Sequence, residues 1–252
     1  MSRMAGAEIN TYSLVGRCAR TGELGACVAS AVPAVGAICL VSRPGVGVAS
    51  TQSWVNPYLA RDALDRMEAG AEAGAALAAV IAGDAASSFR QIGAIATIGP
   101  GAAFTGESCT DWHGQRVGPD FAAQGNMLTG PETLDAMVAA FADLPSAALE
   151  ERLMRALEAA QAAGGDKRGR QSAALLVTNA EAYPRMDLRV DEHADPVAAL
   201  RRVLTVAAAQ LAPFVAGMPR RGATAPPPDP AVIDMLLRSP PDRPAGGGDR
   251  NP

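Results

Sequence analysis

The stretch Asn10–Arg17, NTYSLVGR, decides the fold, and the rest of the chain is organised around it. From Tyr12 onward its residues alternate between two sets, Tyr-Leu-Gly and Ser-Val-Arg, with the period of two that is typical of a half-buried strand. The pattern predicts a first β-strand over residues 11–17. A threonine, Thr11, stands at the leading end of this strand, and ten residues precede it.

Five further segments follow this strand in a fixed order. They are Gly22–Gly25 (GELG), Ser30–Gly36 (SAVPAVG), Ala49–Gln52 (ASTQ), Gln124–Leu128 (QGNML) and Gly164–Ser172 (GGDKRGRQS). Together with NTYSLVGR, they resemble a bacterial family of domains of unknown function that is placed in the N-terminal-nucleophile (Ntn) hydrolase superfamily. The resemblance covers Thr11 to Leu211. It implies a class of chemistry, hydrolysis of an amide by a chain-terminal nucleophile, but no particular substrate.

The composition is that of a globular protein whose core is built from aliphatic residues. Of the 252 residues, 48% are hydrophobic and only 4% are aromatic. The net charge of -4 gives no electrostatic reason to expect nucleic acid as a partner. No apolar run approaches the roughly 20 residues of a membrane span, and the first ten residues lack the apolar region of a secretory signal. We therefore expect a cytoplasmic protein that binds neither nucleic acid nor a membrane.

The four cysteines show no Cys-x-x-Cys pair, and the chain has only two histidines. This pattern predicts reduced core cysteines rather than disulfides. The spacings fit no zinc site, so we expect no metal, and nothing in the sequence implies an organic cofactor.

Hydrophobic periodicity predicts an α+β chain in which groups of strands alternate with pairs of helices. Short apolar runs within residues 11–53 predict an antiparallel meander that includes a strand over 36–41. Asn56 followed by Pro57 predicts a capped helix start, and Ser146 is expected to cap a later helix. Residues 106–130 are expected to form a long ordered loop. The remaining predicted elements are helices over 57–83, 131–144 and 146–163 and from 195, and strands over 91–98, 102–105, 171–179 and 186–190.

This order of elements suits two stacked, mostly antiparallel sheets with helices on the outside. Periodicity alone gives only a mostly antiparallel α+β fold. The resemblance implies the more specific four-layer αββα sandwich of Ntn hydrolases. We expect a leader or propeptide over residues 1–10, an Ntn-hydrolase-like domain over 11–213, and a Pro/Gly-rich, mostly disordered tail over 214–252.

Thr11 is the candidate nucleophile that the resemblance implies. A threonine hydroxyl needs a base, and a chain-terminal threonine supplies its own, because an α-amino group titrates at about 7.7–8.0. The hypothesis therefore requires removal of residues 1–10 by self-cleavage between Asn10 and Thr11. An ordinary strand-edge threonine is the alternative interpretation.

Five polar residues elsewhere are candidates for the rest of the site. Asn126, next to a glycine in the predicted loop, is expected to stabilise the oxyanion, although a turn asparagine explains it equally well. Thr51 and Gln52 follow a predicted strand, where polar side chains would reach the rim of the sheet and contact substrate. Asp166 and Arg168 lie in a glycine-bounded turn and could hold an amine and a carboxylate of the substrate, or form a solvated charged turn.

Three functions are consistent with these residues. The first is an Ntn-type amidohydrolase that acts on a small-molecule amide or a peptide-like bond. The second is a non-catalytic αββα domain that binds a small metabolite or serves as a module of a homo-oligomer, with its leader retained. The third, an enzyme with a cysteine nucleophile, has the least support, because Cys18, Cys27 and Cys39 lie in apolar strands.

Overall fold

The computed structural model describes residues 8–9, 11–224 and 227–238 of the chain. Its elements are β1 (Glu8–Ile9), β2 (Thr11–Arg17), β3 (Leu24–Ser30), α1 (Val35–Cys39), β4 (Leu40–Arg43), β5 (Gly47–Trp54), α2 (Pro57–Glu68), α3 (Ala73–Ala82), the 3-10 helix η1 (Ser87–Phe89), β6 (Arg90–Ala96), β7 (Ala102–Thr105), β8 (Gly114–Gly118), β9 (Phe121–Gly125), α4 (Glu132–Asp143), α5 (Leu149–Ala162), β10 (Ser172–Thr178), β11 (Met186–Val190), α6 (Pro196–Ala216) and α7 (Pro230–Leu237). The chain divides into two units after Leu204, and each is described by itself.

The first unit contains two antiparallel sheets. The six-stranded sheet has the order β11-β10-β3-β2-β9-β8, so that β2 is a central strand. The five-stranded sheet has the order β1-β5-β6-β7, and β4 pairs with the same edge of β5 as β1, farther back along the strand. The sheets stack face to face, with β2 against β5 and β6.

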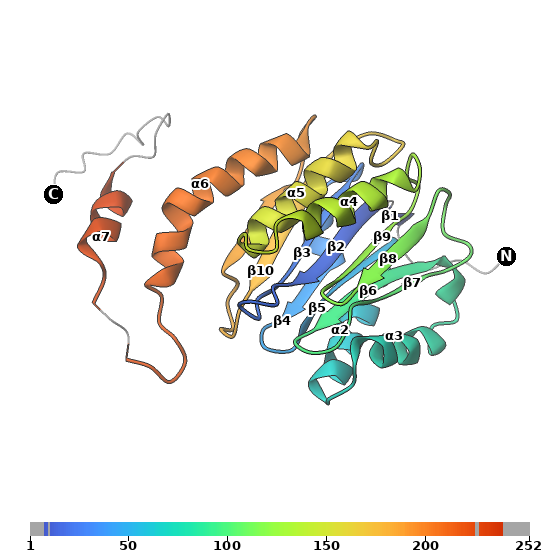
Figure 1. Cartoon of the computed structure of the whole chain (residues 1–252), viewed down its shortest axis with the longest axis horizontal. Helices are drawn as coiled ribbons and strands as arrows, with labels where there is room; N and C mark the ends of the chain where they lie inside the picture. The colour runs from blue at the N-terminus through green and yellow to red at the C-terminus, as the bar shows by residue number, and fades with distance from the viewer. Residues whose placement is uncertain (1–7, 10, 225–226, 239–252) are drawn as a thin grey trace. The chain divides into compact units, whose positions relative to one another are not determined.

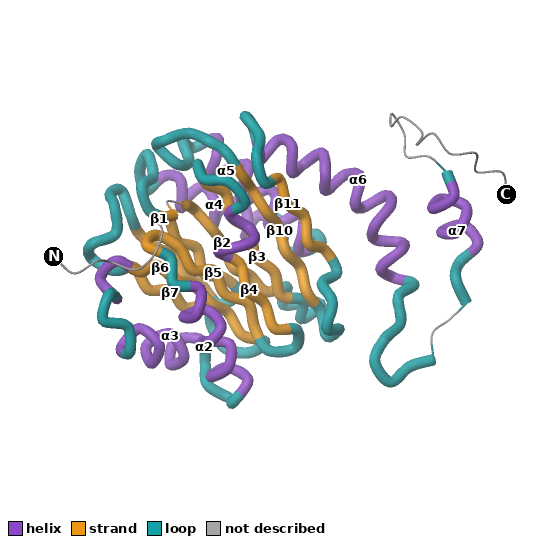
Figure 2. The backbone as a smooth tube through the Cα atoms, turned by 180° about the vertical axis from the view of Figure 1, so that it is seen from behind, coloured by secondary structure: helices purple, strands orange, loops and turns teal. Residues whose placement is uncertain are grey.

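Helices cover both outer faces of this sandwich. Helices α4 and α5 lie on the six-stranded sheet, and α2 and α3 lie on the five-stranded sheet (Figures 1 and 2). The expected mostly antiparallel α+β sandwich of two sheets between helices is therefore confirmed.

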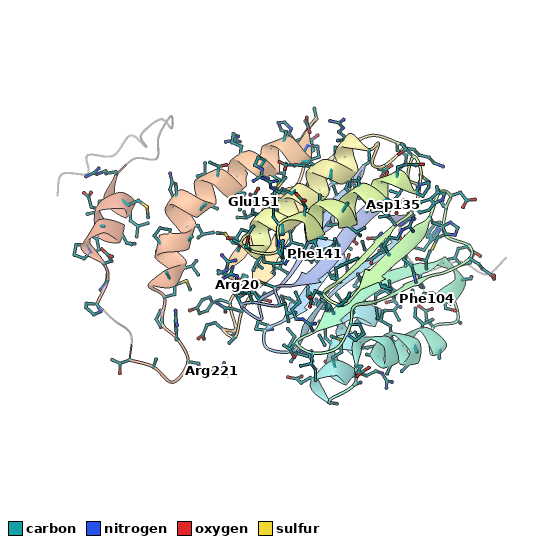
Figure 3. The ribbon with its side chains drawn as sticks, viewed as in Figure 1. Arg20, Phe104, Asp135, Phe141, Glu151 and Arg221 are labelled. Atoms are coloured by element: carbon teal, nitrogen blue, oxygen red, sulfur yellow. The ribbon has the colours of Figure 1, made fainter. Side chains whose placement is uncertain are left out.

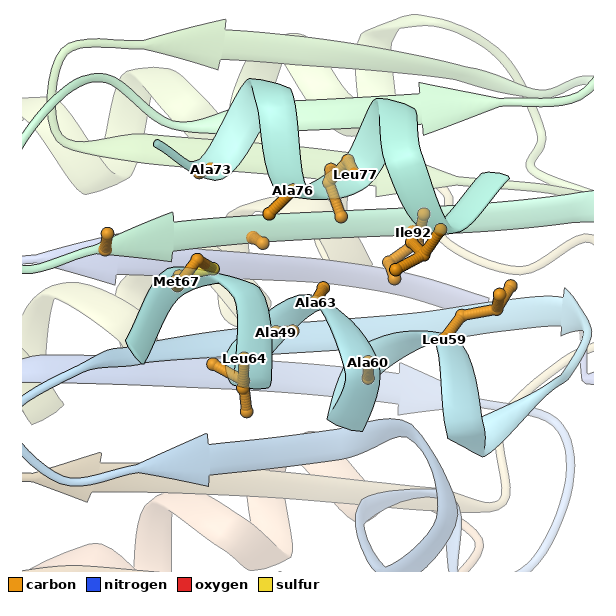
Figure 4. Close-up of a cluster of buried hydrophobic side chains, with 13 residues drawn as sticks. Ala49, Leu59, Ala60, Ala63, Leu64, Met67, Ala73, Ala76, Leu77 and Ile92 are labelled. Carbon is orange, nitrogen blue, oxygen red and sulfur yellow. The ribbon is translucent and has the colours of Figure 1, made fainter. Parts of the chain in front are cut away.

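Apolar stripes at helical spacing explain how α2 and α3 bind their sheet. Leu59, Ala63, Leu64 and Met67 of α2 recur at intervals of three and four residues, and all are buried. They form one cluster with side chains of α3, β5 and β6, which Figure 4 shows in close-up. Burial of each large aliphatic side chain contributes about 1.5–3 kcal/mol to folding.

Glycine allows the opposite helix layer to approach β2 closely. A Cβ atom at Gly16 would lie 2.6 Å from the ring of Phe141 on α4, a residue labelled in Figure 3. The same ring stacks under the guanidinium of Arg152, 4.0 Å from its centroid. The glycine in NTYSLVGR therefore makes room for an aromatic side chain that anchors α4.

Several local predictions are confirmed, among them the start of α2. The Asn56 side chain accepts a hydrogen bond from the Tyr58 amide, and Pro57 takes the first helical position. Ser146 is not a cap, however, because α5 begins at Leu149 and has no side-chain cap.

Three sequence predictions about elements are wrong. Residues 36–41 form helix α1 and then strand β4, because a short apolar run fits a buried helix as well as a strand. The loop expected over 106–130 contains the hairpin of β8 and β9. The expected meander over 11–53 is divided, since β2 and β3 join one sheet and β4 and β5 join the other.

The second unit, Thr205–Pro252, contains the end of α6 and all of α7. Asp229 caps α7 by accepting a hydrogen bond from the Ala231 amide. Parts of the predicted leader (1–7 and 10) and of the predicted tail (225–226 and 239–252) lie outside the described residues.

Within the described residues, α6 is the one helix whose length and composition would suffice to cross a membrane. The sequence reading overlooked it because Arg201 and Arg202 interrupt its apolar run. Core helices of soluble proteins meet the same test, so this property does not identify a membrane span.

A buried ion pair ties the loop after α3 to the start of β6. Asp84 accepts hydrogen bonds from Arg90 Nε at 2.8 Å, from Asn56 Nδ2 at 3.2 Å and from the Ala86 amide at 2.9 Å. Burial alone would raise the pKa of Asp84, but these hydrogen bonds outweigh burial and hold it below its ordinary value. The ionised carboxylate therefore stabilises the fold.

We expect Asp84→Asn to lower the free energy of unfolding by about 3 kcal/mol at pH 7, because Arg90 would be left buried without its counter-charge. Since the pKa is depressed in the folded state, the stabilisation is present above the unfolded-state pKa of about 3.9 and is lost as the pH falls below it. Urea unfolding should show that the difference in unfolding free energy between the parent chain and Asp84→Asn is smaller at pH 3 than at pH 7. Asp65→Asn at the exposed Arg43–Asp65 pair is the control, expected to change stability by less than about 1 kcal/mol at either pH.

Candidate functional site

The space between the two sheets is apolar at one end and polar at the other. Its apolar half consists of Val15, Leu24, Ala26, Val48, Ile95 and Ala122. Its polar half consists of buried side chains on the same inward faces, mostly two or four residues farther along the strands: Thr11, Ser13, Ser30, Ser50, Gln52, Gln91, Gln124, Asn126 and Ser172. Buried polar groups at this density require a hydrogen-bonded network.

Gln52 is the centre of this network and joins the two sheets. Its Oε1 accepts a hydrogen bond from Ser13 Oγ at 2.7 Å. Its Nε2 donates to the Thr11 carbonyl at 3.0 Å and to Gln91 Oε1 at 2.8 Å. One side chain of the five-stranded sheet therefore fixes the backbone at the start of β2.

Gln91 and Gln124 extend the network to the neighbouring strands. Gln91 Nε2 donates to the Gly125 carbonyl at 2.8 Å, and Gln124 Nε2 donates to Ser13 Oγ at 2.8 Å. A Cβ atom at Gly93 would lie 2.1 Å from Gln124 Oε1, so this glycine makes room for the carboxamide. The glutamines hold the polar end of the sandwich in one arrangement.

Thr11 lies in this network at the first position of β2. Its side chain is fully buried, and its hydroxyl donates to Ser30 Oγ on β3 at 3.1 Å. Its carbonyl accepts from Gln52 Nε2 and from the Asn126 amide, both at 3.0 Å. Ser30 on β3 thus holds the hydroxyl of the candidate nucleophile, and Gln52 on β5 and Asn126 after β9 hold its carbonyl.

Asn126 stands directly across from Thr11, just past the end of β9. Its Nδ2 donates to Gln91 Oε1 at 2.9 Å. Its Oδ1 is buried and accepts no hydrogen bond from the described residues. A buried carbonyl oxygen without a donor is costly, and such groups are concentrated where a ligand or water completes the structure.

Strained backbone gathers at the same end of the sandwich. Ala34, Ser53 and Met127 have φ values of 53°, 65° and 52°, in the left-handed region that non-glycine residues rarely adopt. Ser53 directly follows Gln52, and Met127 directly follows Asn126. Strain of this kind is typical of functional sites, because the surrounding structure must hold it in place.

Asp166 and Arg168 lie beside this end and pair with each other. Arg168 Nε and Nη2 contact the two carboxylate oxygens of Asp166 at 3.1 and 2.7 Å. Asp166 is buried and also accepts from the Ala31 amide at 3.2 Å, one residue beyond Ser30. The predicted turn therefore holds an ion pair in which the Asp166 carboxylate is buried and the Arg168 side chain is partly exposed.

The structure brings Thr11, Gln52 and Asn126 together, and it places Asp166 and Arg168 next to them. It does not bring Thr51 to this place, because neighbouring residues of a strand face opposite sides of the sheet. The Thr51 hydroxyl donates to the Asn56 carbonyl at 3.4 Å, at the start of α2 on the helix side.

Sequence reasoning missed four members of the network: Ser13, Ser30, Gln91 and Gln124. Ser13, Ser30 and Gln91 lie in strands that the sequence predicts, so their signal was available, whereas Gln124 lies in the segment that was predicted as a loop. A glutamine at such a position in a predicted core strand is unusual enough to be noted.

One of the four cysteines, Cys109, contacts the strand of Gln91, where its Sγ donates to the Arg90 carbonyl at 3.4 Å. All four are buried, and none forms a disulfide, as predicted. Burial raises the pKa of Cys27 and raises that of Cys39 to about 12, so both thiols are protonated at neutral pH. A cysteine nucleophile has no support at these two positions.

No group of three or more His, Cys, Asp or Glu side chains in the described part of the chain is placed to hold a metal ion. A surface hollow of about 600 Å³ lies between α2 and α3, lined by Tyr58, Asp62 and Arg66 among others. It is separated from Thr11 by the five-stranded sheet, so it belongs to a different face of the molecule.

Comparison with known proteins identifies a family and, among the solved structures, a similar protein that the same family model describes. Residues 11–200 match the family of unknown function DUF1028. The crystal structure of protein SPO2555 from Silicibacter pomeroyi, described by the same family model, is similar with a TM-score of 0.73 and 30% sequence identity. The match covers 79% of this chain and 89% of that one.

A second solved structure, Anbu (ancestral beta-subunit) from Yersinia bercovieri, matches with a TM-score of 0.39 and 12% identity, over 84% of this chain and 100% of that one. A score this low does not establish a shared fold. A search of curated protein sequences found no match.

Proposed function

The chain belongs to the family of unknown function DUF1028, and we propose that it is an Ntn-type amidohydrolase that cleaves a small amide or peptide-like bond. Thr11 is the nucleophile once residues 1–10 have been removed. The observation that carries the proposal is the placement of Thr11 at the start of a central strand, with its hydroxyl directed into a buried polar network. An ordinary strand-edge threonine needs no such surroundings.

Removal of the leader is the first proposed reaction. The Thr11 hydroxyl attacks the Asn10 carbonyl carbon, an ester bond forms, and the Asn10–Thr11 C–N bond breaks as the nitrogen takes up a proton. Water then hydrolyses the ester, which releases the leader with a terminal carboxylate and restores the hydroxyl. Ser30, whose Oγ lies 3.1 Å from Thr11 Oγ1, positions the hydroxyl for this attack.

Hydrolysis of a substrate amide repeats the same chemistry on a second carbonyl. The newly freed α-amino group of Thr11 takes the hydroxyl proton, because its pKa of about 7.7–8.0 leaves much of it neutral near pH 8. The proton passes to the leaving amine, and water hydrolyses the acyl-enzyme. These steps use a hydroxyl, an amine and hydrogen-bond donors, and they call for neither a metal nor an organic cofactor.

Asn126 is the proposed oxyanion donor. Its side chain lies across from Thr11 on the side opposite Ser30, and its Nδ2 would exchange Gln91 Oε1 for the developing oxyanion. Gln52 holds the Thr11 carbonyl and so fixes the geometry of attack. Asp166 and Arg168 form the charged rim toward the substrate, and we leave Thr51 without a role in the reaction.

We expect Asn126→Asp to slow loss of the leader by about 10²-fold, because an aspartate lacks the Nδ2 donor while keeping the size of the side chain. The rate is read as the fraction of shortened chain over time by intact mass. Asn179→Asp is the matched control and should leave the rate unchanged, because Asn179 accepts a hydrogen bond from the Glu181 amide through its Oδ1, which an aspartate retains. Equal rates for Asn126→Asp and the parent chain would remove Asn126 from the oxyanion role.

The proposal is tested first by the intact mass and the N-terminal sequence of the purified protein. We expect a chain that begins at Thr11. A chain that still carries residues 1–10 would leave Thr11 without its base and would contradict the proposed function. We propose a cytoplasmic location and a small-molecule substrate, with neither nucleic acid nor a membrane as partner.

A second candidate function is a non-catalytic αββα domain that binds a small metabolite. The complete burial of Thr11 and the closed Asp166–Arg168 pair favour it, since both keep the site shut in the structure described. This function predicts a retained leader and ligand binding that does not change in Thr11→Ala.

A further inference from the structure

Strand β1, Glu8–Ile9, lies shortly before Thr11 in the sequence and pairs with the edge of the five-stranded sheet, whereas Thr11 belongs to the six-stranded sheet. In β1, Glu8 pairs with Trp54 and Ile9 pairs with Ser53, in antiparallel register with the end of β5. Strand β4 covers the same edge of β5 only from Gly47 to Ser50. The last two residues of β5 therefore pair with β1 and not with β4.

This edge is tied to the nucleophile. Gln52, the residue before Ser53, donates to the Thr11 carbonyl at 3.0 Å. The chain needs only one residue, Asn10, to pass from the paired position at Ile9 to Thr11. A segment bound to the Ser53–Trp54 edge thus ends beside the Thr11 hydroxyl.

The end of β5 also has features that a continuous strand would not require. Ser53 has a φ of 65°, and its Oγ is buried without a hydrogen-bond partner among the described residues. Both features are present with β1 in place, and strain of this kind is concentrated at functional sites, so they mark this edge of β5 as part of one. The edge is short, so it suits an extended segment of a few residues.

We propose that the Ser53–Trp54 edge of β5 is the subsite for the acyl portion of the substrate, and that this portion binds as an extended, peptide-like strand. The inference rests on the proposed function and names its substrate class. Its logic is chemical: in self-cleavage the leader is the acyl group that Thr11 attacks, and in substrate hydrolysis the same hydroxyl attacks another acyl group. Both acyl groups must occupy the same place, and β1 marks that place in the structure.

Recognition through a strand edge depends on main-chain hydrogen bonds more than on side chains. Small amides with a flat ring or a branched acyl group cannot pair with a strand edge. Peptide-like acyl groups with at least two backbone amides can. The leader is then both the first substrate and, until it is released, a plug in the subsite.

The test uses the purified chain after loss of residues 1–10 and a synthetic peptide of residues 1–10 that ends in the Asn10 carboxylate. Binding is measured by the fluorescence of Trp54, with Trp54→Phe as the control for the origin of the signal. Two further peptides carry an N-methyl group on the Glu8 nitrogen or on the Ile9 nitrogen. Neighbouring residues of a strand direct their N–H groups to opposite edges, so only one of the two methyl groups should interfere.

We expect one methylated peptide to bind at least about tenfold more weakly than the unmodified peptide, and the other to bind within about threefold. No binding of the unmodified peptide, or equal binding of all three, would overturn the inference and leave the proposed function intact. A chain that never loses residues 1–10 would overturn the proposed function, and the inference with it.

Discussion

Replacement of Thr11 by alanine is expected to abolish loss of the leader and all amide hydrolysis by the protein. The change removes the one hydroxyl that self-cleavage and substrate hydrolysis share, so both rates should fall by at least about 10⁴-fold, the scale on which loss of a nucleophile acts. Thr11→Ser keeps a hydroxyl at the same atom and should retain both reactions at a lower rate. Intact mass over time measures the first reaction, and release of amine from peptide-like amides measures the second.

The matched control is the next residue of the same strand, Tyr12. Its ring faces the helices, and its hydroxyl donates to Gln161 Oε1 at 3.1 Å, on the opposite side of the sheet from Thr11. Tyr12→Phe should therefore leave leader loss unchanged. If Thr11→Ala loses its leader as the parent chain does, Thr11 is not the nucleophile and the hydrolase proposal is wrong.

The fold was predictable where the information is local. Period-two alternation located β2, short apolar runs located β3 and β10, and the Asn56–Pro57 pair located the start of α2. These signals act within a few residues, so the sequence displays them directly. The sandwich of two sheets followed from the order of these elements together with the family resemblance.

Sheet membership was not predictable, because it depends on pairing between distant residues. No local feature of residues 40–54 indicates that β4 and β5 belong to a different sheet from β2 and β3. The apolar run at 36–41 was ambiguous for the same reason, since packing of α1 against β3 and β10 decides its conformation. The local pattern allows either a helix or a strand in such a segment, and tertiary contacts decide which of them forms.

The candidate site was predicted in part. Thr11, Gln52 and Asn126 are neighbours, as the hypothesis required, but the glutamines that join them were missed. Thr51 and Gln52 were expected to follow a strand and reach its rim, but both lie inside β5, which places adjacent side chains on opposite faces. The pairing of Asp166 with Arg168 could not be read from their spacing, because residues two apart in a turn meet only in a particular backbone conformation.

Gln52→Leu is expected to lower the free energy of unfolding by about 4 kcal/mol, which is a large part of the stability of an ordinary domain. Leucine has a similar size, so the cost comes from hydrogen bonds and not from a cavity. The Ser13 hydroxyl would lose its acceptor, and a buried group left without a partner costs about 1–3 kcal/mol. Gln91 Oε1 and the Thr11 carbonyl would each keep only the donor that Asn126 supplies, and each hydrogen bond lost there costs about 0.5–1.5 kcal/mol. Urea unfolding at pH 7 measures the change, with an unaltered dependence on denaturant as the sign of an intact fold.

Thr51→Val is the control one residue away, on the other face of β5. It removes a single long hydrogen bond of 3.4 Å and should cost no more than about 1 kcal/mol. A large difference between these neighbours would show that the inward network, and not β5 as a whole, stabilises the polar end of the sandwich. Equal and small effects would mean that Gln52 can be replaced without loss, and that the network is retained for function. In that case Gln52→Leu should still slow loss of the leader, because the Thr11 carbonyl would no longer be held in position for attack.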